Sequence, residues 1–281
     1  MDVAIGLPNA VPGTTGEQLV EWARRAEARG FSSLGTIDRV VYDNWEPLLA
    51  LAAAAAVTER IGLRTSVLLG PLRTNVAELA KQARTLNGIA GGRFKLGIAL
   101  GAREDDYEIS GVEYAGRGKR FDEELARLKE IWASEEVGPA SAAPPQLIVG
   151  GHADASFRRA ARFGDGWVAG GASPEEFAAM VGKLKDAWSQ AGREGAPSTM
   201  GLAYYGLGEN AVENAREELT GYYAWLGEEI ANYIADSAAT DAETVRQYIA
   251  AFAGAGCEEL ILFPTSSDPE QVDLLADAAG L

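Results

Sequence analysis

Two glycine pairs near the middle of the chain are the residues best suited to hold a ligand. Gly150-Gly151-His152 follows an apolar run and precedes a helical pattern, and Gly170-Gly171 stands at the same place after the next apolar run. Backbone N–H groups at a glycine-rich helix N-terminus bind phosphate. A single Gly-Gly pair is a common turn, but two pairs at neighbouring strand ends predict a phosphate-binding cup.

His152 is the only histidine of the chain. Three roles are open to it: a contact to phosphate, a general base, since an imidazole titrates near neutral pH, or a loop histidine with a local hydrogen bond. One histidine and one cysteine, Cys257, make no zinc cluster. We therefore expect no metal site, and we expect Cys257 to be a buried structural thiol.

Three further strand ends carry residues that can meet a substrate or a flat ring. Asp38-Arg39 can orient a substrate or donate to a ring, the alternative being a salt bridge within the loop. Ser66-Val67 offers a small polar side chain, the alternative being ordinary barrel packing. Gly101 leaves room for a planar ligand, and Arg103 opens a charged run that is otherwise typical of a solvated helix start.

These residues need strands to bring them together, and the chain alternates strand and helix patterns from end to end. Helix signals separate the strands: Thr14 and Glu17 have the capping-box spacing, and Ser173-Pro174 with Glu176 supplies an N-cap, a first-turn proline and an N3 acid. The strands are predicted at 3–7, 32–37, 61–69, 93–100, 146–149, 167–169, 199–207 and 259–263.

Eight strands, each followed by a helix, predict an α/β fold: a single (β/α)8 TIM barrel over residues 1–281. The alternative is an open doubly wound sheet, which usually has G-x-G-x-x-G after its first strand. This chain has PNAVPG at 8–13 instead, which favours the barrel. Residues 218–240 form an extra helical segment after the seventh strand, either a lid over the barrel mouth or a helix pair on its flank.

The charge and the apolar runs limit the partners. The chain has a net charge of −16, which argues against nucleic acid and against anionic membranes as partners. Its longest apolar run, at 47–57, is shorter than the roughly 20 residues of a membrane span. The first residues lack the basic start of a signal peptide. We expect a cytoplasmic protein.

Several stretches together resemble the bacterial luciferase-like monooxygenase superfamily. The most specific are GGRFKLG at 91–97, REDDY at 103–107 and GRGKRFDE at 116–123. The others lie at 30–34, 56–63, 79–86, 148–151 and 158–167. The resemblance spans about residues 3–170, and the more C-terminal elements keep the expected order.

The resemblance implies a luciferase-like barrel, often dimeric, that holds FMN or a deazaflavin (coenzyme F420) with its ring in the barrel mouth. It implies phosphate binding at Gly150-Gly151-His152 and Gly170-Gly171, and a cis peptide bond at Ser66-Val67 behind the ring. It also implies a small organic substrate and a separate flavin reductase as electron donor.

Two departures bear on the activity. Many relatives have Asp-His where this chain has Asp38-Arg39, and deazaflavin-dependent sugar dehydrogenases carry a glutamate where Ala102 stands. The leading hypothesis is therefore an FMN-dependent monooxygenase with Asp38, Arg39 and Arg103 on the substrate side. The alternatives are a deazaflavin-dependent reductase or dehydrogenase, and a flavin-binding protein without turnover.

Overall fold

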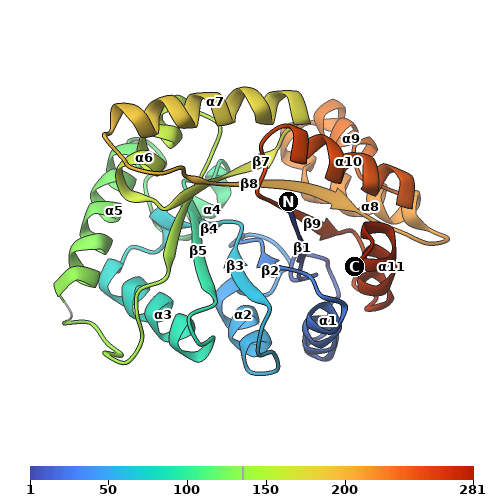
Figure 1. Ribbon diagram of the computed structural model, residues 1–281, viewed down its shortest axis with the longest axis horizontal. Coiled ribbons are helices and arrows are strands. Elements are labelled where there is room, and N and C mark those ends of the chain that lie inside the picture. Colours follow the sequence, from blue (N-terminus) through green and yellow to red (C-terminus); the bar gives the residue numbers. More distant parts are fainter. Residues whose placement is uncertain (135) are drawn as a thin grey trace.

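The computed structural model describes residues 1–134 and 136–281 and contains the predicted closed parallel barrel, ringed by helices (Figure 1). Its strands are β1 (Asp2–Gly6), β2 (Ser33–Thr36), β3 (Gly62–Thr65), β4 (Leu68–Leu69), β5 (Phe94–Ala99), β6 (Gln146–Gly150), β7 (Gly166–Gly171), β8 (Ser198–Tyr205) and β9 (Glu259–Pro264). Its helices are α1 (Gly16–Arg29), α2 (Pro47–Ala55), the 3-10 turn η1 (Gly70–Leu72), α3 (Val76–Ile89), α4 (Glu104–Ile109), α5 (Arg117–Ser134), α6 (Asp154–Phe163), α7 (Pro174–Gln190), α8 (Ala211–Tyr222), the 3-10 turn η2 (Ala224–Leu226), α9 (Glu228–Asp236), α10 (Ala242–Gly254) and α11 (Glu270–Ala279).

The third predicted strand, 61–69, is not continuous. It is divided into β3 and β4, and the peptide bond between Ser66 and Val67 at the division is cis, as the family resemblance implied. Both parts pair with β5, so together they occupy one of the eight strand positions of the barrel, each of which we call a stave. The β3–β5 pairing closes the ring. Nine strand segments thus make eight staves.

Two helix starts, those of α1 and α7, have capping boxes that the sequence predicts to within one residue. The capping box of α7 is as predicted, with Ser173 Oγ accepting from Glu176 N and Glu176 accepting from Ser173 N. For α1 the prediction is wrong by one position: Thr15 is the N-cap and pairs with Gln18. Thr14 Oγ1 instead donates to Pro8 O and Val11 O, so it fixes the loop after β1.

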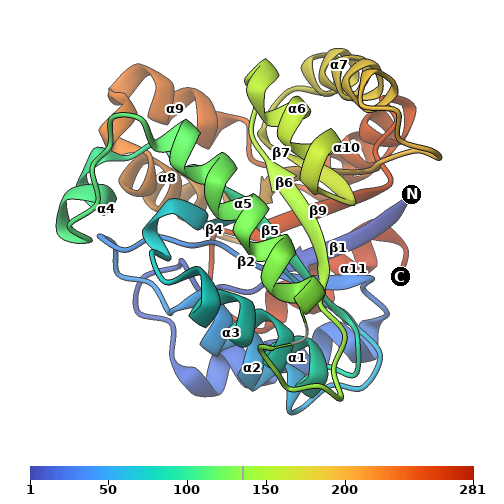
Figure 2. The same ribbon diagram turned by 90° about the vertical axis from the view of Figure 1, so that its left-hand side faces the viewer.

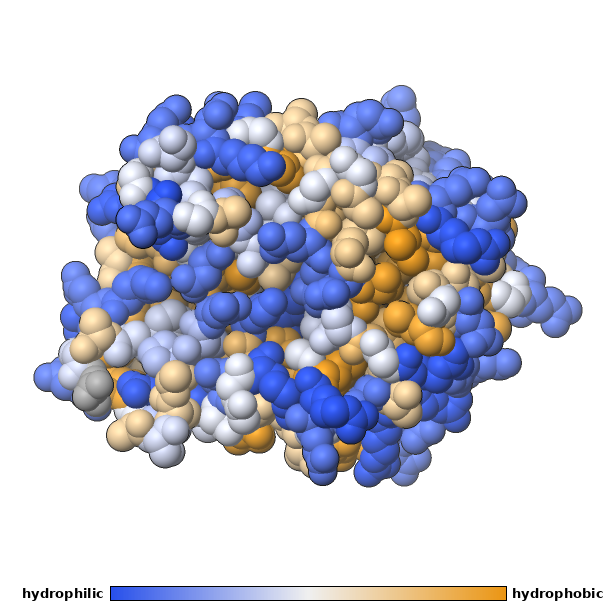
Figure 3. Space-filling view, in the orientation of Figure 1, coloured by the Kyte–Doolittle hydropathy of each residue, from blue (hydrophilic) through white to orange (hydrophobic). Residues whose placement is uncertain are grey.

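The two ends of the barrel differ in what covers them. Figure 2 shows α4, α8 and α9 at the end opposite to the two chain termini, which is the end where the strands finish. The face that carries the termini has hydrophilic side chains over much of its surface (Figure 3). Within the described ranges, no helix is long and apolar enough to cross a membrane.

A buried ion pair fills the barrel at the end where the strands begin. Arg64 Nη1 on β3 donates to Glu259 Oε2 on β9 at 2.9 Å, and both side chains are buried. Ser32 and Ser33 donate their hydroxyls to the other carboxylate oxygen at 2.7 and 2.8 Å. Burial alone would raise the pKa of Glu259, but the charge of Arg64 and the two hydroxyl donors hold that pKa below its usual value.

We predict that Glu259→Gln lowers the free energy of unfolding by about 3–5 kcal/mol at pH 7, because it leaves the Arg64 charge buried without a carboxylate. The lowered pKa means that this stabilisation is present above the ordinary value of 4.5 and is lost as the pH falls through the lower pKa of the folded protein. Urea unfolding at pH 7 and pH 3 measures both effects, and the wild type should lose more stability in acid than the variant. The double variant Arg64→Met/Glu259→Leu, which removes both charges, is the matched control. Equal stability of Glu259→Gln and the wild type at pH 7 would contradict the prediction.

Candidate active site

A cavity of about 200 Å³ lies at the barrel mouth, where the strands end. Seven of the predicted site residues line it: Asp38, Arg39, Ser66, Val67, Arg103, Gly170 and Gly171. The extra segment after β8 supplies Tyr222, Tyr223 and Trp225 to the same cavity. Of the two predicted positions for this segment, the structure therefore shows the one over the mouth.

Asp38 and Arg39 do not act on each other. Asp38 Oδ2 accepts from Leu69 N at 2.8 Å and from Arg73 Nη2 at 3.1 Å. Arg39 pairs with Asp106 at the start of α4. The salt bridge within the loop, which the sequence left open as an alternative, is wrong, because each group has a partner on another segment.

Asp106 organises the loop after β2. Its carboxylate accepts from Arg39 Nε at 2.7 Å and from the backbone N–H groups of Val40 and Val41 at 2.9 and 2.7 Å. The side chains of Arg39 and Asp106 are only 5% and 2% exposed. The guanidinium also lies 5.6 Å from the ring centroids of both Tyr42 and Tyr222. Arg39 is thus held in one orientation.

Two buried donors at this cavity lack a hydrogen-bond partner in the described part of the chain. They are Arg39 Nη1 and Ser66 Oγ. A buried polar group without a partner costs about 1–3 kcal/mol, so such groups in a cavity call for an explanation. A ligand with acceptor atoms in the cavity would explain both donors, because both residues lie on the cavity wall.

Arg103 and Gly101 take positions that the sequence did not specify. Arg103 Nε donates to Asp105 Oδ1 at 2.9 Å, and the guanidinium lies 5.5 Å from the ring centroid of Trp225. The ion pair with Arg103 holds the pKa of Asp105 below its usual value. Gly101 does not line the cavity: a Cβ there would lie 2.8 Å from Leu69 Cδ2, so the glycine makes room for Leu69.

The first glycine pair lies beside the cavity. A Cβ on Gly150 would lie 3.0 Å from Val67 Cγ1, so this strand end packs against the cis peptide. Gly151 has a φ of 128°, and a Cβ there would lie 2.4 Å from Ser156 Oγ. No side chain caps the N-terminus of α6, which follows directly. The N–H groups of Asp154 and Ala155 therefore have no side-chain acceptor in the described part of the chain, whereas Ser156 N donates to Ala153 O at 2.7 Å. The Asp154 carboxylate lies in the same turn and pairs with Lys183.

The second glycine pair differs from the prediction. Gly170-Gly171 is not a turn but the end of β7, where the register with β8 shifts. The helix after it already has Glu176 in its capping box, so a carboxylate lies at that N-terminus. Gly170 instead gives room to His152, whose Nε2 would lie 3.4 Å from a Cβ on Gly170. Partial burial of the imidazole lowers the pKa of His152 and favours its neutral form, although the residue as a whole is exposed.

Sequence reasoning missed Asp106 and Trp225 as site residues. Asp106 lay in a charged run whose most common role is a solvated helix start, and no local spacing connects it to Arg39. The tyrosines of the extra segment carried a signal, because their helical spacing indicates one apolar face. The hydroxyls of Tyr204 and Tyr223 form a hydrogen bond of 2.7 Å. Burial raises the pKa of both, so they stay neutral.

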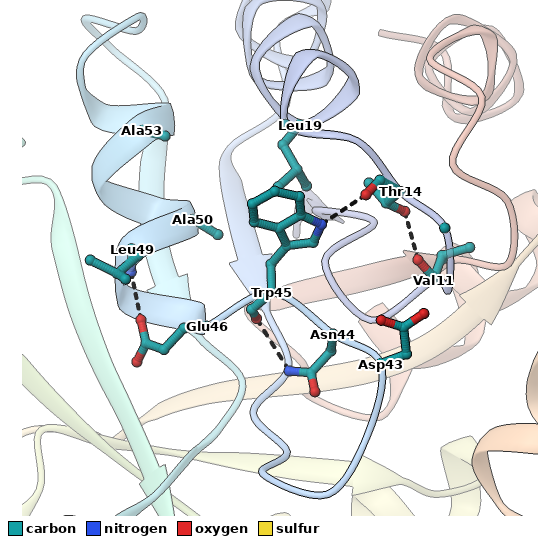
Figure 4. Close-up of a pocket in the computed structure, with 12 residues that line it drawn as sticks. Val11, Thr14, Leu19, Asp43, Asn44, Trp45, Glu46, Leu49, Ala50 and Ala53 are labelled. Atoms are coloured by element: carbon teal, nitrogen blue, oxygen red, sulfur yellow. Dashed lines mark hydrogen bonds between the residues drawn. The ribbon is translucent and has the colours of Figure 1, made fainter.

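A cavity larger than the one at the mouth lies elsewhere. A hollow of about 520 Å³ lies outside the barrel between α1 and α2 (Figure 4). Trp45 projects into it and donates its Nε1–H to Thr14 O at 2.9 Å. It contains neither of the unpartnered donors of the mouth, and the helix start on its wall, at Gly16, is already capped by the Thr15 side chain. We therefore place the active site at the mouth despite the smaller volume. No three potential metal ligands gather among residues 1–134 and 136–281.

A closed parallel barrel with a cavity at its strand ends defines the class of (β/α)8 barrel proteins with a mouth site. The chain belongs to the luciferase-like monooxygenase family, whose profile matches residues 1–259. Members of this family are oxidoreductases.

Individual relatives agree with this assignment. An uncharacterized protein of Mycobacterium tuberculosis is 33% identical in an alignment of 207 residues that covers 61% of this chain and 71% of that protein. The pyrimidine monooxygenase RutA of Escherichia coli is 26% identical over 70% of this chain and 59% of its own length.

Solved structures show the same fold. The monooxygenase RslO1 from Streptomyces bottropensis matches with a TM-score of 0.78 and 23% identity over 99% of this chain and 98% of that one. An F420-dependent secondary alcohol dehydrogenase, in complex with an F420-acetone adduct, matches with a TM-score of 0.83 and 19% identity over 99% of both chains. Identities this low establish the fold and leave the cofactor open.

We predict that Asp106→Asn lowers the free energy of unfolding by about 3–5 kcal/mol, because it leaves the buried Arg39 charge unpaired. The adjacent Asp105→Asn is the matched control. Asp105 pairs with Arg103 at a site where its side chain is 38% exposed, and solvent screening limits such a pair to about 1 kcal/mol or less. Urea denaturation of the two variants measures the difference, and equal effects would show that Asp106 does not organise the mouth.

Proposed function

We propose that this protein is an FMN-dependent monooxygenase that oxidises a small organic substrate at the barrel mouth. Two features at the same end of the barrel together support the proposal. One is the uncapped helix start after Gly150-Gly151, and the other is the cavity lined by aromatic side chains. Membership of the luciferase-like monooxygenase family supports the reaction class.

The residues present fit an FMN. Its phosphate would meet the first-turn N–H groups of α6 and His152, and its ring would lie toward Ser66-Val67 in the cavity. Bound FMN, once reduced, supplies the reaction with dioxygen that oxidises the substrate. At about 200 Å³ the cavity is smaller than the usual 300–1,000 Å³ of ligand pockets, so we propose that the segment with Trp225 moves outward on binding.

The chain's own side chains have the remaining tasks. Asp38 holds Leu69 and Arg73 in place, and Asp106 holds Arg39. Tyr222, Tyr223 and Trp225 exclude water from the cavity. Arg39, Ser66 and Arg103 are the groups that we propose to contact the substrate.

A deazaflavin is the less favoured cofactor, because three of the arginines that would form a groove for its polyanionic tail already have partners. Arg159 Nε donates to Asp122 Oδ1 at 2.5 Å, Arg120 donates to two backbone carbonyls, and Arg117 stacks on Tyr114. A flavin-binding protein without turnover remains the outcome if the FMN-loaded protein oxidises nothing.

We also propose a homodimer in the cytoplasm that receives reduced FMN from a separate reductase. The support for a dimer is α2, which is apolar on all sides although it lies outside the barrel. Its Leu49 is 72% exposed, and the adjacent Trp45 is 45% exposed. A helix apolar all round is normally buried, and a second copy of this chain would bury it. Light scattering of the pure protein tests the dimer, and a monomer at micromolar concentration would rule it out.

We predict that Ala153→Asp weakens FMN binding by about tenfold or more and leaves riboflavin binding unchanged. An aspartate at the N-cap of α6 would occupy its N–H groups and repel the phosphate, which riboflavin lacks. The same change should stabilise the folded protein by about 1 kcal/mol, because the aspartate would cap a helix that has no side-chain cap in the wild type. Flavin fluorescence titration and urea unfolding measure the two effects.

Asn210→Asp is the matched control, since it adds one negative charge at the N-cap of α8. It should leave the affinity for FMN within about twofold of the wild type. If Ala153→Asp weakened FMN and riboflavin equally, the phosphate would not lie at α6.

A further inference from the structure

Two residues that line the mouth cavity carry a buried hydrogen-bond donor without a partner among the described residues. Arg39 Nη1 and Ser66 Oγ are both buried and without a partner in the described part of the chain, and both residues line the cavity. They come from the ends of neighbouring staves, since Arg39 follows β2 and Ser66 follows β3. Buried donors of this kind point to an acceptor atom on the ligand.

The Arg39 donor has a fixed direction. Its Nε is bound to Asp106 Oδ2 at 2.7 Å, its Nη2 donates to Val41 O at 3.1 Å, and two tyrosine rings flank the guanidinium. Only Nη1 remains for a ligand. A donor that is held in place before the ligand arrives needs no ordering when the ligand binds.

The charges at the cavity are already matched. Asp106 pairs with Arg39, Asp105 pairs with Arg103, and Arg73 pairs with Asp38. An anionic group would bring a charge without a counterion among the apolar side chains of Leu202, Val67 and Trp225, which is unfavourable. A neutral acceptor oxygen satisfies the two donors without adding charge.

We propose, on the basis of the proposed function, that the substrate is an uncharged carbonyl compound whose oxygen accepts hydrogen bonds from Arg39 Nη1 and Ser66 Oγ. A ketone, ester or amide on a compact apolar frame has this chemistry. The isoalloxazine ring also has carbonyl oxygens, and the position of Arg39 favours the substrate. In the ring of eight staves β2 lies opposite β7, across the mouth from Gly170 and His152, where the phosphate end of the cofactor would lie.

The test compares two probes of the same shape on the FMN-loaded protein. 4-Fluoroacetophenone has the carbonyl oxygen, 4-fluoroethylbenzene lacks it, and fluorine NMR titration measures both affinities. The wild type should bind the ketone at least about tenfold more tightly, because a site with buried donors discriminates against an analogue that leaves them unpaired. 4-Fluorophenylacetate, an anion, should bind more weakly than the ketone.

Two variants locate the discrimination. Arg39→Lys keeps a positive charge against Asp106 but loses the guanidinium fork, and Ser66→Ala removes only the hydroxyl. Arg39→Lys should reduce the preference for the ketone to within about threefold and should bind FMN as the wild type does. Ser66→Ala should reduce the preference partly. Thermal unfolding identifies a variant that fails to fold, in which case the other variant decides.

The outcomes separate this inference from the proposed function. Equal binding of the ketone and the hydrocarbon by the wild type, or tighter binding of the anion, overturns the carbonyl proposal. Weaker FMN binding by Arg39→Lys with an unchanged ketone preference overturns it as well, because the donors would then hold the flavin ring. If the wild type binds no FMN, the proposed function fails, and the same probe pair on the cofactor-free protein still tests the carbonyl site.

Discussion

The Asp106 carboxylate is the interaction on which the mouth of this barrel depends. It lies on α4 after β5 and binds the loop after β2 through Arg39 and two backbone N–H groups. Two staves of the barrel are thereby joined above the strand ends. The same ion pair neutralises Arg39 and orients it, so that one N–H remains at the cavity. The tyrosines of the segment after β8 then cover a guanidinium that is already fixed.

The barrel closure places the rest of the site. Parallel pairing brings every strand end to one face, so residues from β2, β3, β5, β7 and the segment after β8 line a single cavity. The other end of the barrel has a different task, because the buried ion pair of Arg64 and Glu259 lies there. That pair joins β3 to β9, whereas the proposed site lies at the mouth.

The sequence predicted the barrel well, because strand and helix patterns, caps and glycine pairs are local signals. It failed where a side chain's partner is distant in the sequence, or where two neighbouring residues suit the same role equally well. Asp106 is 67 residues from Arg39, so no spacing could connect them. Thr14 and Thr15 are equally good caps by type, and only the loop after β1 decides between them. Gly170-Gly171 suits a turn and a strand end equally, and the register shift with β8 selects the strand end.

The most direct test of the account is a titration of the cofactor-stripped wild type with FMN and, separately, with the deazaflavin, followed by absorbance and fluorescence. A mouth with the uncapped start of α6 after Gly150-Gly151 for phosphate, and with Arg117, Arg120 and Arg159 already engaged, should bind FMN with a Kd of about 1 µM or tighter. It should bind the deazaflavin at least about a hundredfold more weakly. Tight binding of the deazaflavin without binding of FMN would contradict the account and assign the barrel to hydride transfer.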